Sequence, residues 1–93
     1  MAVDFSKPPE ESEVYPAAHS FRLIAEAAAE EAVARAASEV LEAFEVLEPL
    51  AKGRASSGGR YVSLRVTVRL VDRAGHHRLD AALRAIPGVR ILL

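Results

Sequence analysis

The chain has 93 residues, of which 51% are hydrophobic and 27% are charged, with a formal net charge of −1 and no cysteine. This length suits one small domain. The lack of cysteine excludes disulfides, thiolate nucleophiles and cysteine-based zinc or iron–sulfur sites. No apolar run approaches the roughly 18 residues of a membrane-spanning helix, and the first residues lack the features of a signal peptide. We therefore expect a cytoplasmic protein.

The charges divide unevenly along the chain. Residues 1–50 carry eleven acidic and three basic side chains, whereas residues 51–93 carry two acidic and nine basic ones. Such asymmetry is typical of proteins that bind an anionic partner. It equally fits two halves of opposite charge that face each other within one domain or in a dimer.

The first elements can be read from hydropathy. Residues 1–14 are polar and acidic and contain Pro8 and Pro9, which predicts a flexible tail outside a domain of residues 15–93. Residues 19–24 alternate, with Phe21 and Leu23 on one side, which predicts a strand.

Residues 25–44 are rich in alanine and contain neither glycine nor proline, so they predict a helix. Its expected buried stripe follows three- and four-residue spacing. The stripe comprises Ala29, Ala32, Val33, Ala36, Val40 and Phe44.

Residues 45–54 contain Pro49, which limits them to an imperfect edge strand. Residues 55–60 include Gly58 and Gly59 and predict a turn. Residues 61–71 alternate strictly and predict a strand with one buried face. Its core side comprises Val62, Leu64, Val66, Val68 and Leu70.

A second helix is predicted over residues 74–86. Asp72 is placed to cap its start, and Pro87 and Gly88 end it. Leu79, Leu83 and Ile86 share one face with His76. Residues 89–93 then predict a fourth strand.

The predicted order is β-α-β-β-α-β, the split βαβ arrangement of ferredoxin-like folds. We therefore expect an α+β sandwich in which two helices cover one face of a four-stranded antiparallel sheet. The expected strand order is 4-1-3-2.

Three segments resemble the YbeD-like family of small bacterial proteins of unknown function. The first is Tyr15-Pro16 leading into Phe21-Arg22-Leu23-Ile24. The second is Ser56-Ser57-Gly58-Gly59-Arg60-Tyr61 with Ser63 and Thr67, and the third is Val89-Arg90-Ile91-Leu92-Leu93. The resemblance covers residues 15–93.

This resemblance implies a ferredoxin-like fold similar to ACT regulatory domains and no established enzymatic activity. By analogy, a small metabolite would bind near Ile24, Ala25 and Glu26, with the turn of Ser56, Ser57, Gly58 and Gly59 as a further ligand or partner loop. Ala25 stands where the family commonly has glycine, which weakens the carry-over of amino-acid binding.

Motifs for catalysis or metal binding are absent from the sequence. His76 and His77 diverge by about 100° on a helix, so they cannot chelate one ion together. The Ser56–Gly59 turn precedes a strand and not the helix that phosphate loops require. We find no Ser-His-Asp spacing and no cofactor fingerprint, so we expect a non-enzymatic protein without metal or cofactor.

Basic and polar residues are expected to share the sheet face that the helices leave open. Ferredoxin-like RNA-binding modules use this face, but they stack bases on central aromatic side chains. Here only Tyr61 is near, which makes nucleic acid the weaker alternative. The expected interaction face comprises Arg22, Tyr61, Ser63, Arg65, Thr67, Arg69 and Arg90.

The sequence thus predicts a small regulatory or adaptor domain, acting through contact with a protein or by sensing a small metabolite. Two alternatives remain open, namely a nucleic-acid-binding module that uses the basic face and a structural homodimer subunit.

Overall fold

The computed structural model describes residues 15–53 and 58–93. The predicted tail of residues 1–14, and Ser56 and Ser57 of the predicted turn, lie outside these ranges. The described elements are strand β1 (Ala17–Glu26), the short 3-10 helix η2 (Ala27–Ala29), helix α1 (Glu30–Leu41), strand β2 (Glu45–Lys52), strand β3 (Tyr61–Leu70), helix α2 (Arg73–Arg84) and strand β4 (Val89–Leu92).

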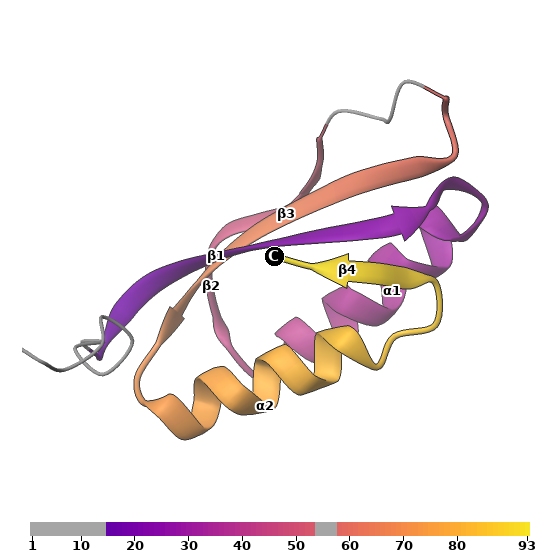
Figure 1. Ribbon diagram of the computed structural model, residues 1–93. Coiled ribbons are helices and arrows are strands. Elements are labelled where there is room, and N and C mark those ends of the chain that lie inside the picture. The colour runs from indigo at the N-terminus through magenta and orange to yellow at the C-terminus, as the bar shows by residue number, and fades with distance from the viewer. Residues whose placement is uncertain (1–14, 54–57) are drawn as a thin grey trace, which may run out of the picture.

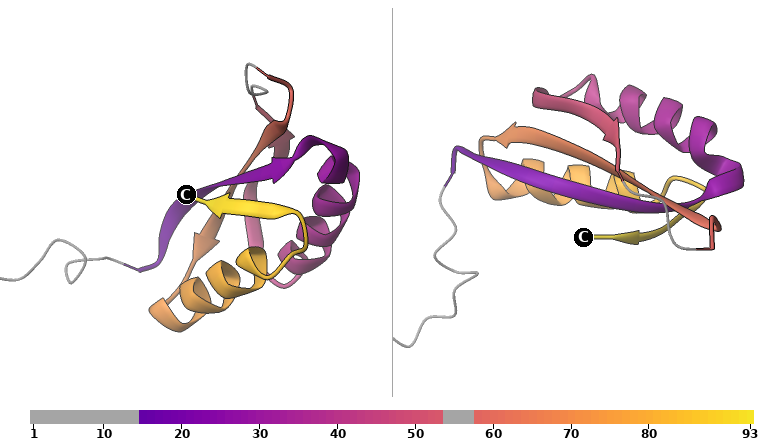
Figure 2. Two further views of the ribbon diagram at one scale, coloured as in Figure 1. Left: turned by 45° about the vertical axis from the view of Figure 1, so that its right-hand side comes forward. Right: turned by 90° about the horizontal axis from the view of Figure 1, so that it is seen from above.

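The four strands form one antiparallel sheet in the order β2-β3-β1-β4. This is the predicted order 4-1-3-2 read from the opposite edge. The long central strands pair over their full length, from Ala17 with Leu70 to Glu26 with Tyr61. Both helices lie on one side of the sheet (Figures 1 and 2). The predicted ferredoxin-like α+β fold is confirmed.

The core lies between this covered side of the sheet and the two helices. Alternate residues of the central strands supply one wall, as the period of two in their sequences predicts. The helices supply the other wall. The core comprises Phe21, Leu23, Ala25, Val33, Ala37, Leu41, Val62, Leu64, Val66, Val68, Leu70, Leu79, Leu83, Ile86 and Leu92.

The first helix differs from its prediction at its start and in part of its buried stripe. Ala25 and Glu26 continue β1, because they pair with Val62 and Tyr61 in the ladder. Ladder pairing and full burial of Ala25 outweigh the high helix propensity of alanine. The buried residues of α1 are Val33, Ala37 and Leu41. Four further members of the predicted stripe are partly buried against the core, namely Ala29, Ala36, Val40 and Phe44.

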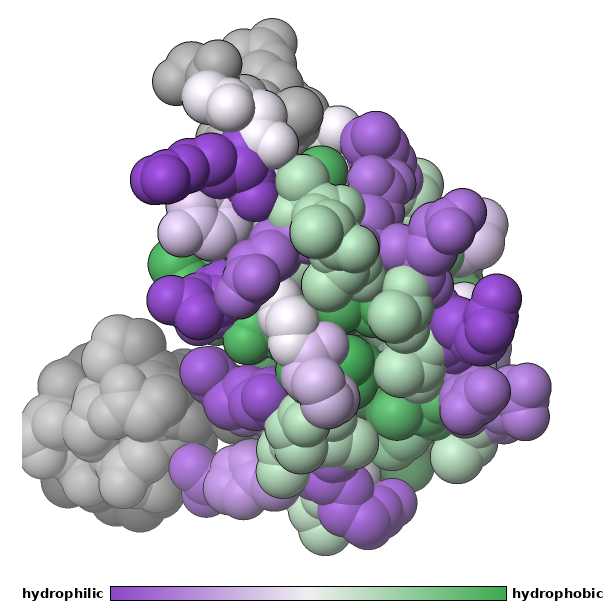
Figure 3. Space-filling model, turned by 90° about the vertical axis from the view of Figure 1, so that its right-hand side faces the viewer, coloured by the Kyte–Doolittle hydropathy of each residue, from purple (hydrophilic) through white to green (hydrophobic). Residues whose placement is uncertain are grey.

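Ala32 therefore lies on the exposed side of α1, although the sequence predicted it in the core. Ala28, in η2, is exposed as well. Figure 3 looks at the end of the molecule where β1 turns into α1, and it shows a mildly apolar band between hydrophilic side chains. Because alanine is small and only weakly hydrophobic, an alanine-rich sequence does not show clearly which side of the helix is buried.

Specific contacts fix the ends of the remaining elements. Asp72 caps α2, since its Oδ1 accepts a hydrogen bond of 2.7 Å from the Gly75 backbone N–H. Register shifts interrupt β2 on both sides of Glu48, as an edge strand with Pro49 predicts. Leu93 follows β4 and exchanges two backbone hydrogen bonds with Arg22, of 2.9 and 3.0 Å. Among the described residues, no helix is long and apolar enough to cross a bilayer.

Candidate functional site: an arginine pair on the open sheet face

The candidate site lies on the side of the sheet that the helices do not cover, which we call the open face. Side chains of β1 and β3 that alternate with the core residues project onto it. Edge strands β2 and β4 add further side chains at its margins. The residues of the open face used below are Ser20, Arg22, Ile24, Glu48, Ser63, Arg65, Thr67, Ile91 and Leu93.

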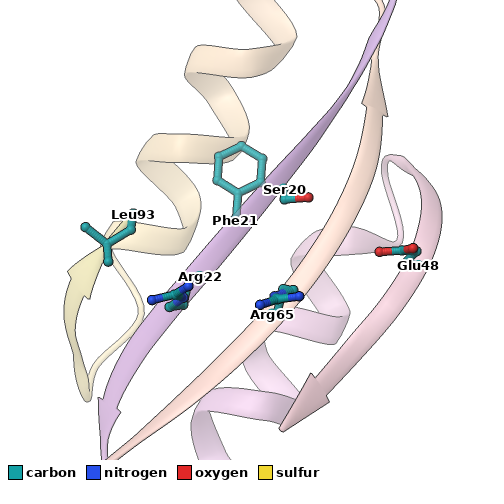
Figure 4. Close-up of a pocket in the computed structure, with 6 residues that line it drawn as sticks. All are labelled: Ser20, Phe21, Arg22, Glu48, Arg65 and Leu93. Carbon is teal, nitrogen blue, oxygen red and sulfur yellow. The ribbon is translucent and has the colours of Figure 1, made fainter. Parts of the chain in front are cut away.

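Two arginines occupy neighbouring positions at the middle of this face. Arg22 on β1 and Arg65 on β3 are direct cross-strand partners, and both are exposed. Figure 4 shows them side by side on the central strands. Like charges directly opposite each other destabilise a sheet, so this pair has an energetic cost in the free protein.

No acidic side chain of the described ranges neutralises either guanidinium. The salt bridges of the described residues join other side chains, and neither arginine makes a side-chain hydrogen bond within residues 15–53 and 58–93. Guanidinium groups present a planar fork of donors that matches carboxylate and phosphate oxygens. The pair can therefore receive an anionic group from another molecule.

Glu48, whose carboxylate lines the same depression as the two arginines, is held by a hydroxyl group. Thr67 donates a hydrogen bond of 2.9 Å to Glu48 Oε1, and its own oxygen lies 2.8 Å from Ser20 Oγ. Because a hydroxyl has only one hydrogen, Ser20 is the donor to Thr67. This chain of hydrogen bonds links β1, β3 and β2, and it gives Glu48 a partner other than Arg65.

A shallow depression of about 370 Å³ lies at this position. Figure 4 shows its lining, with the Phe21 side chain directed toward α2 and the arginines on the strands beside it. The margin nearest β4 is apolar, because the hydrophobic side chains of Ile91 and Leu93 are 51% and 65% exposed there. The lining comprises Ser20, Phe21, Arg22, Glu48, Arg65 and Leu93.

The other arginines of the predicted interaction face have acidic partners. Arg69 lies 3.8 Å from Glu45 of β2, and Arg90 lies 3.2 Å from Glu26 of β1. Arg90 reaches the open face because the ladder between β1 and β4 shifts register next to it. Tyr61 lies at the start of β3, away from the centre of the face. Arg69 and Arg90 thus form salt bridges, whereas Arg22 and Arg65 form none with the described residues.

The two predicted ligand loops approach each other at the far end of β1. The Ala27 backbone N–H donates to the Arg60 carbonyl at 2.8 Å, next to Gly58 and Gly59. A second depression, of about 400 Å³, lies here, lined by Glu26, Ala27, Ala28, Gly59, Arg60 and Tyr61. Ala25 is fully buried and has no positive φ, so alanine fits where the family commonly has glycine.

Aromatic and imidazole rings gather at the opposite end of β1. Tyr15 stacks on His19 with 5.6 Å between ring centroids, and its hydroxyl lies 2.8 Å from His76 Nδ1. The rings of His19 and His76 are 4.7 Å apart, and Phe21 meets His76 edge-on. The sequence placed His76 on the apolar face of the second helix but did not reveal its contact with His19, since 57 positions separate them. Within the described ranges, no three metal-ligating side chains come together.

Two solved structures have the same fold. One is the solution structure of protein HP0495 from H. pylori, with a TM-score of 0.73 and 18% identity, covering 100% of this chain and 94% of that one. The other is the C-terminal domain of the MgtC protein from Mycobacterium tuberculosis, with a TM-score of 0.66 and 21% identity, covering 87% of this chain and 88% of that one. At these identities the likeness shows the fold alone.

Sequence comparison identifies the family more directly. No curated protein matches the chain. The family model described as "Protein of unknown function (DUF493)", the YbeD family, matches residues 10–93. The chain therefore belongs to this family, as the three resembling segments predicted.

Proposed function

We propose that this protein is a non-enzymatic regulatory or adaptor domain of the cytoplasm that acts through protein contact. Its open face receives an acidic segment of the partner, whose carboxylates pair with Arg22 and Arg65. The observation that carries this proposal is the direct cross-strand pairing of two arginines that have no acidic partner in the described ranges. A partner carboxylate would remove the repulsion that the free domain retains.

The surroundings of the pair favour a protein over a nucleic acid. The side chains next to it are hydroxyls and the exposed aliphatic groups of Ile91 and Leu93. Single-stranded nucleic acids are bound by positive charge together with aromatic rings on which bases stack. Arginine combined with apolar side chains and hydrogen-bonding groups is typical of protein interfaces. We accordingly expect a partner segment that combines acidic and aliphatic residues.

The proposal assigns no catalytic step to this face. The Ser20–Thr67–Glu48 chain contains two hydroxyls and a carboxylate, without an imidazole to remove a proton from either hydroxyl at neutral pH. Its geometric effect is to connect three strands beside the arginine pair. We infer that it holds the open face in shape for binding.

Binding of a defined probe tests the proposal. The probe is a synthetic peptide in which glutamate and leucine alternate, titrated into isotope-labelled protein and followed by the NMR signals of the backbone and the arginine side chains. We expect signals of Arg22 and Arg65 to shift. The double variant Arg22→Gln/Arg65→Gln should lose about tenfold in affinity, the equivalent of one strong charged hydrogen bond.

The matched control is Arg35→Gln/Arg78→Gln. It removes the same charge from two exposed positions on the helices and should bind the peptide like the wild type. Equal losses of peptide affinity in both double variants would show that only net charge matters, and would contradict a specific site at Arg22 and Arg65. Binding of oligouridylate that weakens steeply with added salt, without peptide binding, would overturn the proposal in favour of the nucleic-acid alternative.

A second candidate function is the sensing of a small metabolite, favoured by the depression between Glu26 and Gly59. A ligand that binds only the folded state raises the melting temperature. A thermal-shift screen with amino acids and common metabolites tests it, with Arg60→Gln as the variant at that site. A dose-dependent rise that this variant abolishes would favour sensing.

A further inference from the structure

The two edges of the sheet differ in how they prevent pairing with another strand. Native proteins protect exposed strand edges with charged side chains, proline and irregular pairing. Edge strand β2 has all three, since it contains Pro49, carries Glu45, Glu48 and Lys52, and shifts register twice. Adding a strand to β2 is therefore unfavourable.

Edge strand β4 has little of this protection in the stretch from Ile91 to Leu93. This stretch is entirely apolar, and its pairing with β1 is regular, from Ile24 with Ile91 to Arg22 with Leu93. The one charged residue of β4, Arg90, is paired with Glu26 at 3.2 Å.

The backbone of this stretch offers hydrogen-bonding groups to a further strand. Leu93 exchanges both of its backbone hydrogen bonds with Arg22. In an antiparallel ladder, successive residues direct these groups to opposite sides. The N–H and C=O of Leu92 consequently face the free edge of the sheet, because β4 is the last strand in the order.

The side chains around Leu92 complement a copy of themselves. Leu92 is buried in the core, whereas Ile91 and Leu93 project from the open face and are 51% and 65% exposed. If two copies of β4 pair antiparallel about a two-fold axis at Leu92, the two Leu92 residues exchange both backbone hydrogen bonds. Each Ile91 then lies opposite the other copy's Leu93, which forms two apolar cross-strand pairs.

We propose that the free edge of β4 is a self-association surface, where a second copy of this chain pairs at Leu92 and joins two sheets into one of eight strands. The two-fold axis of such a pair is perpendicular to the sheet, so both open faces lie on the same side. Both copies of the Arg22–Arg65 pair then belong to one continuous surface. This proposal shares the apolar side chains of Ile91 and Leu93 with the site proposed for the acidic partner, but it rests on the free edge of β4 and not on the arginine pair.

The proposed pairing uses Ile91, Leu92 and Leu93 of each chain, so we expect a weak dimer that forms as the concentration rises. Sedimentation velocity from about 10 µM to about 1 mM measures this directly. The wild type should shift from monomer to dimer over this range. Ile91→Lys should stay monomeric, because it places two like charges beside the axis. Val46→Lys, at an exposed position of β2, is the matched control and should dimerise like the wild type.

Disulfide formation tests the register, and the absence of native cysteine makes the result unambiguous. Facing positions in an antiparallel pair that do not exchange hydrogen bonds lie close enough for a disulfide. The geometry places Ile91 opposite Leu93 of the second copy. A mixture of the Ile91→Cys and Leu93→Cys variants should therefore form the mixed disulfide about tenfold faster than either variant forms its own, because the dimer raises the effective thiol concentration.

Two results would overturn the proposal. One is a monomeric wild type throughout the concentration range, with cysteine variants that cross-link at equal rates alone and mixed. The other is a dimer that Val46→Lys breaks and Ile91→Lys does not. Neither result affects the peptide-binding test of the arginine pair, so the two proposals can fail separately.

Discussion

Arg22 and Arg65 face each other across the two central strands of the sheet. Neither forms a salt bridge with a carboxylate of the described ranges. Such a pair lowers the stability of the free domain. A neutral side chain at either position would stabilise the fold more. A destabilising pair of this kind is expected at a binding site, since function is often retained at some cost in stability.

Replacing one member of this pair should therefore stabilise the protein. We expect Arg65→Gln to raise the free energy of unfolding by a few tenths of a kcal/mol at low salt. The gain should shrink at high salt, where the Debye length falls to about 3 Å. Urea denaturation at both salt concentrations measures the effect. Arg35→Gln, which lies on α1 between Glu31 and Glu39, should not stabilise; a loss of stability in Arg65→Gln would contradict the repulsion.

The cap of α2 provides a second prediction. Asp72 Oδ1 accepts a hydrogen bond from the Gly75 N–H at 2.7 Å, so Asp72→Ala leaves that donor without its partner. We expect a loss of about 1 kcal/mol in chemical denaturation. Asp80→Ala is the control, since the ion pair of Asp80 with Arg84 lies on the helix surface and contributes only a few tenths of a kcal/mol. Equal losses would contradict the capping role.

Much of the fold could be read from the sequence because its strands carry a strong signal. The alternation of Val62, Leu64, Val66, Val68 and Leu70 fixed the covered face of β3, and all five are buried. The centre of the buried stripe of α1 was misplaced, with Ala32 predicted in the core but exposed, because alanine contributes little to the hydropathy pattern. Val33, Ala37 and Leu41 form the actual stripe, and the large residue Leu41 was the available clue.

The site was predicted only in outline. Alternation placed Arg22 and Arg65 on one face, but it could not tell them apart from Arg69 and Arg90. That difference depends on register, which places Glu45 opposite Arg69, and on the irregular pairing that brings Arg90 to Glu26. Hydropathy specifies register only weakly in a strand as exposed as β2, and it does not reveal a local shift.

Gly88 should tolerate no side chain. Its φ is +99°, and a Cβ there would lie 2.8 Å from Ala29 Cβ and 2.9 Å from Val33 Cγ2. Gly88→Ala combines a strained backbone with a clash against α1, so we expect a loss of about 2–4 kcal/mol in denaturation. Gly59→Ala has φ +71° but open space around it, and should lose only about 1 kcal/mol. The reverse order would contradict the packing of Gly88 against α1.

The last prediction concerns the buried Nε2 atom of His19. His19 Nε2 is buried and has no hydrogen-bond partner among the residues that the structure describes. The ring stacks on Tyr15, and its centroid lies 4.7 Å from that of the His76 ring. Burying a polar atom without a partner costs about 1–3 kcal/mol. Phenylalanine would keep the stacking and remove that cost. We therefore expect His19→Phe to raise the free energy of unfolding by about 1 kcal/mol, as measured by urea denaturation at neutral pH. His77→Phe, at an exposed position, should give no gain. A loss of stability in His19→Phe would show that the nitrogen makes a contact that phenylalanine cannot replace.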